Sequence, residues 1–151
     1  MAGYLNSYHW PFLAQPAPLP ERLIGNDPDF YLDHLLTRWA GRPGKLAAEA
    51  VSAYQRAMRK PTVIQAMAED YRAGADIDLI HDRADREAGR KITCPLLVIW
   101  GNRYLDQSPV RVWQDWAEDI REVELDCGHF IAEEAPEDCA QALLGFFRDA
   151  G

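Results

Sequence analysis

The hydrophobic pattern of the chain changes near residue 90. Before that point, apolar residues recur at helical spacing, and prolines and glycines divide the segments without any alternating strand pattern. After it, residues 95–101 read PLLVIWG, a continuous apolar run that ends in glycine. Such a run is typical of a strand that is buried on both faces of a parallel sheet. The pattern therefore predicts a helical region over residues 1–90 and an α/β region over residues 91–151.

In the first region, the helix boundaries follow from capping residues and breakers. Asp27 and Pro28 provide a capping side chain and a first-turn proline, and Gly41 ends the helix that they begin. The Pro-rich residues 16–20 are expected to form a loop that enters a short helix. The helix that begins at Asp27 is expected to span residues 27–40. Further helices are expected over residues 45–59 and 62–73 and within residues 76–90.

The second region reads as strand, helix, strand and helix. A helix that carries Val112, Trp113 and Trp116 is expected to place both tryptophans in the core, because they lie three residues apart on one face. A strand over residues 122–125 and a closing helix over residues 136–149 follow. Two doubly covered strands do not make a stable parallel sheet, so we expect an incomplete sheet whose other strands lie upstream of Met1. A dimer that joins two such strand pairs is the alternative.

Composition and charge restrict the partners. The chain has 16 basic and 24 acidic residues, a net charge of -8, and no cluster of lysines and arginines, which argues against nucleic acid as a partner. Its three cysteines, Cys94, Cys127 and Cys139, lack CxxC spacing, so no disulfide framework and no metal site is predicted. The absence of a signal-like segment or a long apolar run predicts a cytoplasmic protein without membrane contact.

His129 is the candidate for catalysis. It follows the second predicted strand in the sequence VELDCGHF, where a tight turn would present an imidazole in front of a helix. A histidine in this position can activate a side-chain nucleophile or a water molecule. No serine lies in a Gly-x-Ser-x-Gly context, and Asp126 is only three residues from His129 on the same turn, which leaves little room for attack. A base is therefore predicted without a nucleophile.

Several short segments carry a resemblance to a known family. They are His9-Trp10, the sequence DYRAG at residues 70–74, CPLLVIWG at residues 94–101 and CGHF at residues 127–130. With these segments in this order, the chain resembles the C-terminal half of the α/β-hydrolase superfamily, with two parallel strands and flanking helices preceded by a helical cap. Within that superfamily it looks most like the fluoroacetate (haloacetate) dehalogenases.

This resemblance implies a reaction and a set of residues. In such enzymes an aspartate displaces halide from a small 2-haloacid, and a histidine-activated water hydrolyses the resulting ester. His129 matches that histidine, while His9, Trp10 and Tyr71 match the residues that bind the halide. No cofactor and no metal are implied, the partner is a small haloacid, and a homodimer is possible by the same resemblance.

The chain also departs from the family pattern. The nucleophilic aspartate, the arginines that hold the substrate carboxylate, the oxyanion donors and the acid partner of the histidine precede the His-Trp segment in the family and have no counterpart here. In many α/β-hydrolases the acid follows the strand that ends in Trp-Gly, where this chain has Tyr104, with Asp106 as a weak candidate nearby. Three alternatives remain open: an inactive truncated product or pseudoenzyme, a fragment similar to an epoxide hydrolase, and a helical interaction module that pairs through its sheet edge.

Overall fold

A computed structural model describes residues 7–149 of the chain. It divides into two compact units. One, the helical unit, comprises Met1–His34 and Glu49–Ala84, and the other, the strand unit, comprises Leu35–Ala48 and Asp85–Gly151. The predicted division into a helical cap over residues 1–90 and an α/β core part over residues 91–151 stays a prediction.

The helical unit is held together by packing on its longest helix, α6. The order of its elements is α2 (His9–Leu13), α3 (Leu19–Asn26), the first part of α4 (Pro28–Trp39), most of α5 (Ala48–Met58), α6 (Pro61–Ala75) and the first part of α7 (Ile77–Glu87). Both α2 and α3 pack against α6. The buried apolar residues of the unit are Leu13, Ile24, Leu32, Met58, Ile64 and Ala68.

The start of α4 confirms the predicted cap. The backbone N–H of Phe30 donates a hydrogen bond of 3.1 Å to Asp27 Oδ1, and Pro28 is the first helical residue. The carboxylate thereby satisfies one of the backbone donors that a helix leaves unpaired at its N-terminus.

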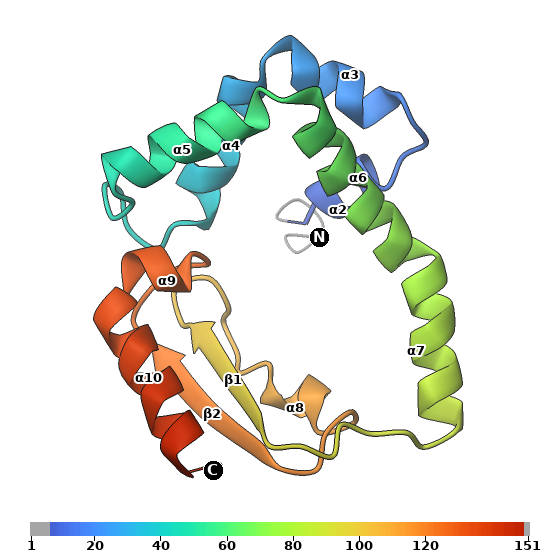
Figure 1. The fold of residues 1–151 in the computed structure, drawn as a ribbon, viewed down its shortest axis with the longest axis vertical. Coiled ribbons are helices and arrows are strands. Elements are labelled where there is room, and N and C mark those ends of the chain that lie inside the picture. The colour runs from blue at the N-terminus through green and yellow to red at the C-terminus, as the bar shows by residue number, and fades with distance from the viewer. Residues whose placement is uncertain (1–6, 150–151) are drawn as a thin grey trace. The chain divides into compact units, whose positions relative to one another are not determined.

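The strand unit contains the predicted pair of parallel strands. Strand β1 (Leu96–Gly101) pairs with β2 (Ile120–Leu125) so that Leu96 lies opposite Ile120 and Gly101 opposite Leu125. The short helices α8 (Val110–Trp113) and α9 (Ile131–Glu134) flank β2, and α10 (Pro136–Asp149) packs along both strands (Figure 1). The order strand, helix, strand and helix is therefore confirmed.

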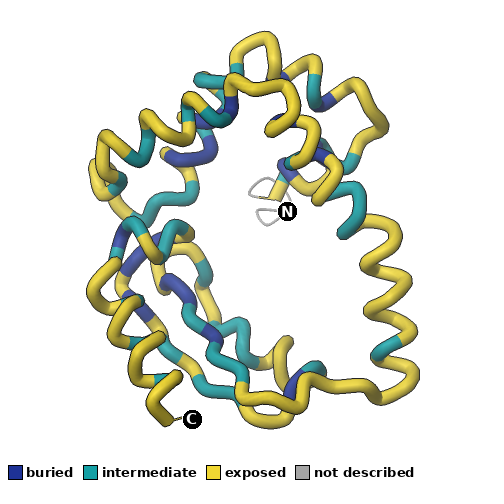
Figure 2. Tube along the Cα trace, in the orientation of Figure 1, coloured by how far each residue is buried: buried dark blue, intermediate teal, exposed yellow. Residues whose placement is uncertain are grey.

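The sheet is open. Among residues 7–149 it has two strands, so β1 has one hydrogen-bonded neighbour within the described chain. Val98 and Trp100 are buried, but Leu97 and Ile99 on the other face are only half-buried, so the prediction of burial on both faces was wrong for this chain by itself. Most of α10 is exposed as well (Figure 2), and its uncovered apolar side chains include Leu143, Leu144 and Phe147.

The predicted core position of Trp113 and Trp116 is also wrong. Helix α8 ends at Trp113, so the two tryptophans do not share a helix face. Trp113 is 38% exposed and Trp116 is half-buried. The buried residue of this segment is Ala117, which forms an isolated parallel bridge with Ile92. The chain turns toward β2 before a second helical turn can form.

Within residues 7–149, none of the helices combines the length and the apolar character needed to cross a bilayer.

Candidate functional site

The turn that carries His129 is fixed by hydrogen bonds from three successive backbone N–H groups. Gly128 N donates to Glu134 Oε2 at 3.0 Å, His129 N donates to the carbonyl of Trp39 at 2.8 Å, and Phe130 N donates to Glu134 Oε1 at 3.2 Å. The turn joins β2 to α9, and the backbone at Gly128 is buried while His129 itself is exposed. A turn whose three amide N–H groups are all paired thus presents an accessible imidazole.

Glycines allow three chain segments to approach one another beneath this turn. A Cβ atom built at Gly128 would lie 2.6 Å from the carbonyl oxygen of Trp39, closer than any real side chain comes. At Gly41 the same construction gives 2.9 Å to the Cys127 carbonyl carbon, and Gly101 at the end of β1 is equally crowded by the 127–128 backbone. Glycine is therefore required for close backbone approach rather than for a positive φ.

Three aromatic rings surround the imidazole of His129. The ring of Tyr104 is 4.5 Å away between centroids, the ring of Trp39 is 5.2 Å away, and that of Phe130 is 5.3 Å away. Trp39 and Phe130 meet the imidazole edge to face, while Tyr104 is tilted by 49°.

Desolvation of the imidazole lowers the pKa of His129 below its ordinary value of 6.5. The negative charge of Glu134 acts in the opposite direction and raises that pKa, but its effect is the smaller one. The lowered pKa keeps the imidazole neutral at pH 7, which is the form that accepts a proton as a general base. Desolvation also raises the pKa of Tyr104, so its phenol remains protonated at that pH.

Asp126 forms ion pairs with two arginines. Its carboxylate lies 2.7 Å from Arg42 and 2.7 Å from Arg103, which come from the segments after α4 and after β1. These pairs are solvent-exposed and contribute little to stability, about 1 kcal/mol or less each. That Asp126 is not a nucleophile stays a prediction. Asp106 is exposed on the loop after β1.

The helical unit brings His9, Trp10 and Tyr71 together. The ring centroids of His9 and Tyr71 are 5.8 Å apart, those of Trp10 and Tyr71 5.0 Å, and those of His9 and Trp10 6.4 Å. His9 is buried, Tyr71 is half-buried and Trp10 is 53% exposed. We call these three residues the aromatic trio.

The neighbour of Tyr71 fixes the trio in place. Arg72 donates to the Gln15 carbonyl just beyond α2 at 2.9 Å and to Glu21 of α3 at 2.5 Å. Both side chains of the Arg72–Glu21 pair are only 17% exposed, so this ion pair is less screened than those at the surface. The DYRAG segment thus has a physical role: through Arg72 it ties α6 to α3 and to the end of α2, the helix that carries His9 and Trp10.

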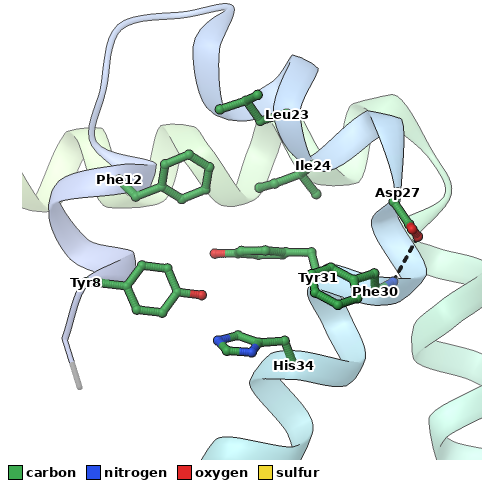
Figure 3. Close-up of a pocket in the computed structure, with 8 residues that line it drawn as sticks. All are labelled: Tyr8, Phe12, Leu23, Ile24, Asp27, Phe30, Tyr31 and His34. Atoms are coloured by element: carbon green, nitrogen blue, oxygen red, sulfur yellow. Dashed lines mark hydrogen bonds between the residues drawn. The ribbon is translucent and has the colours of Figure 1, made fainter. Parts of the chain in front are cut away.

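The helical unit also contains a pocket of about 400 Å³. In it the hydroxyl of Tyr8 points between Tyr31 and His34 (Figure 3). Burial raises the pKa of Tyr31, and the nearby phenols of Tyr8 and Tyr71 raise it further. No member of the aromatic trio lines this pocket, whose walls are formed by Tyr8, Phe12, Leu23, Ile24, Asp27, Phe30, Tyr31 and His34.

In the part of the chain that the structure describes, no three His, Cys, Asp or Glu side chains are arranged to hold a metal ion. The three cysteines are free thiols, with Cys94 exposed and Cys127 buried.

Sequence reasoning missed three residues around His129. No sequence feature assigned a role to Trp39 or Glu134, and Tyr104 was identified only by its place on the loop where many α/β-hydrolases carry an acid. The sequence signals that could have revealed these contacts are weak. Gly41 and Gly128 are compatible with close backbone approach, but nothing in an apolar run identifies the distant segment that it contacts. His34, which the sequence did not single out, is half-buried and lines the pocket of the helical unit.

Comparisons with known proteins place the chain in a family. It is 38% identical over 148 residues to the fluoroacetate dehalogenase of a Burkholderia species, covering 95% of this chain and 48% of that protein. The structure of a mutant Pseudomonas aeruginosa protein assigned as an epoxide hydrolase, with bound MFA, matches with a TM-score of 0.91 and 42% identity, covering 99% of this chain and 51% of that one. A protein of Nostoc sp PCC 7120 assigned as an α/β hydrolase matches with a TM-score of 0.88 and 41% identity, covering 97% and 51%. No protein-family model matches the chain.

The chain thus spans about half the length of each of these relatives. This coverage agrees with the predicted correspondence to one half of an α/β hydrolase, and the open two-stranded sheet agrees with it too. The chain belongs to the α/β-hydrolase superfamily and, along nearly its whole length, is related to the fluoroacetate dehalogenases.

Proposed function

We propose that this chain supplies the ester-hydrolysing histidine and the halide-binding residues of a haloacetate dehalogenase. The observation that carries the proposal is the aromatic trio: His9, Trp10 and Tyr71, matched to the family by sequence alone, lie with their ring centroids 5.0–6.4 Å apart in the helical unit. The similarity to the Burkholderia fluoroacetate dehalogenase supports the same substrate class.

His129 would perform the second step of the reaction. Its neutral imidazole takes a proton from a water molecule, and the hydroxide attacks the carbonyl carbon of an aspartyl ester. The bond between the carbonyl carbon and the alkoxide oxygen breaks, the imidazolium returns its proton to that oxygen, the 2-hydroxyacid leaves, and the aspartate is restored as it loses its own proton to solvent. The lowered pKa of His129 supports this role, because the imidazole is unprotonated at neutral pH.

The aromatic trio would act in the first step. Fluoride is a poor leaving group, so N–H and O–H donors aimed at the developing anion lower the barrier mainly in the transition state. An imidazole, an indole and a phenol each provide one donor. The nucleophilic aspartate has no counterpart among the residues of this chain, so a nucleophile-bearing half must supply the ester.

A chimera tests this function. The chain would be joined to the N-terminal half of the Burkholderia fluoroacetate dehalogenase, and fluoride release from fluoroacetate would be followed with an ion-selective electrode. We expect turnover by the chimera and none by this chain alone. A chimera that melts cooperatively but releases no fluoride would sink the proposal, and turnover by the isolated chain would refute the need for a second half.

Epoxide hydrolysis is the second candidate. The observation in its favour is that Tyr8 and Tyr31 both line the pocket of the helical unit (Figure 3), so this unit offers more than one tyrosine hydroxyl to an epoxide oxygen. The similarity to the Pseudomonas protein adds support. The same chimera given styrene oxide separates the two: diol formation without fluoride release would favour the epoxide reaction.

Two further alternatives are an inactive product and a helical interaction module. The first is an inactive truncated product or pseudoenzyme. It predicts that the chimera stays inert toward both substrates although it folds. The second, a helical interaction module, predicts instead that the isolated chain captures a partner through its sheet edge. An active chimera would count against both alternatives, because it would show that the residues of this chain retain catalytic competence.

A further inference from the structure

We infer that Glu134 is the positioning residue for His129, and this inference rests on the proposed role of His129 as the base. Glu134 does not approach the imidazole through any hydrogen bond described above. Instead its carboxylate binds the backbone on both sides of His129 and a separate segment after α4.

The carboxylate of Glu134 accepts three hydrogen bonds from main-chain donors. Gly41 N donates to Oε2 at 2.8 Å, Gly128 N donates to Oε2 at 3.0 Å, and Phe130 N donates to Oε1 at 3.2 Å. The residue is 9% exposed. A buried carboxylate is costly unless it is satisfied, and hydrogen bonds from backbone N–H groups to a charged acceptor are among the strong ones.

These bonds determine where the imidazole can lie. With the amides of residues 128 and 130 held by Glu134 and the His129 amide held by the Trp39 carbonyl, the backbone on both sides of His129 is fixed. The bond to Gly41 joins the turn to the segment that carries Trp39, so the imidazole and the ring of Trp39 are held in one arrangement. Loss of the carboxylate would release both partners together.

The negative charge adds a second effect. It raises the pKa of His129 against the larger lowering by desolvation, so the carboxylate both holds the turn in place and keeps the imidazole more basic than desolvation alone would leave it. A base must be in place and unprotonated to be effective, but also basic enough to take a proton from water. A neutral amide at this position would provide neither the charge nor three acceptor sites.

The test is Glu134→Gln in this chain, with NMR titration of His129 and hydrogen exchange of the amides at Gly41, Gly128 and Phe130. We expect the His129 titration midpoint to move to lower pH, and exchange at the three amides to become at least about fivefold faster. The matched control is Glu137→Gln, which removes one exposed carboxylate from the first turn of α10. It should leave both readings near those of the wild type.

Unchanged titration and unchanged exchange in a folded Glu134→Gln variant would overturn the inference. If that variant does not fold, Glu134→Asp gives the answer: its side chain is one methylene shorter, which weakens the three hydrogen bonds, so exchange at Gly41, Gly128 and Phe130 should again become faster, and unchanged exchange would equally refute the inference. Neither reading depends on fluoride release. An inert chimera would therefore count against the proposed function without touching the Glu134 result.

Discussion

The ring of Tyr104 lies 4.5 Å from the imidazole of His129, centroid to centroid, on the loop that follows β1. In many α/β-hydrolases this loop carries the acid that pairs with the histidine, as the resemblance implies. Here a phenol whose pKa is raised by desolvation occupies the place, so it stays neutral and contributes an aromatic surface rather than a charge. Any carboxylate partner of His129 must come from another position.

Replacing this phenol by a carboxylate should change the titration of the histidine. In Tyr104→Asp we expect the pKa of His129 to rise, because a nearby negative charge favours the imidazolium and loss of the ring reduces desolvation. NMR titration of the histidine measures the shift. Tyr104→Phe is the control and should leave the pKa low. An unchanged midpoint in Tyr104→Asp would mean that the loop does not face the imidazole in solution.

The lowered pKa of His129 also predicts how stability depends on pH. In the folded chain the imidazole of His129 binds a proton less tightly than in the unfolded chain, where the ordinary pKa of 6.5 applies. The contribution of His129 is therefore complete above about pH 6.5 and is lost as the pH falls through the lowered folded-state value. Urea unfolding of the wild type and of His129→Gln, compared over about pH 5 to 8, should show a smaller acid loss in the variant. Parallel curves would contradict the lowered pKa.

Close backbone packing at the turn predicts a large effect of one methyl group. Gly128→Ala should lower the free energy of unfolding by about 2 kcal/mol or more, because its Cβ would lie 2.6 Å from the Trp39 carbonyl oxygen. Gly145→Ala on α10 is the matched control, since a Cβ there meets nothing within 4 Å. That change should stabilise the chain by about 0.5–1 kcal/mol through helix propensity. Equal effects in thermal unfolding would argue against the crowded turn.

The aromatic trio predicts a separation of stability from activity. Tyr71→Phe keeps the ring that packs on His9 and Trp10 but removes the O–H donor. In the chimera we expect defluorination to fall by about ten- to a hundredfold, as for a lost hydrogen bond worth about 1.5–3 kcal/mol to a charged group, with little change in the melting temperature. Tyr54→Phe, on exposed α5, provides the control. Full activity of Tyr71→Phe would remove Tyr71 from the halide site.

The sequence predicted those parts of the fold that depend on local chemistry. The proline and glycine breakers led to helix boundaries close to those found, and α10 spans Pro136–Asp149 as expected. Trp113 was misplaced because its predicted core position depends on a longer helix, whereas α8 ends at Trp113 itself. The contact of Trp39 with His129 could not be predicted, because the two are far apart in sequence and nothing in a helical pattern identifies a distant partner.

The central claim is that His129 hydrolyses an ester that another part of the enzyme forms. The most direct measurement is the amount of fluoride released by the chimera that carries His129→Asn. We predict a single release of about one fluoride per active site, followed by no turnover and by an aspartyl ester that mass spectrometry detects on the protein. Continuous fluoride release by the variant would contradict the claim, because water would then be activated without His129.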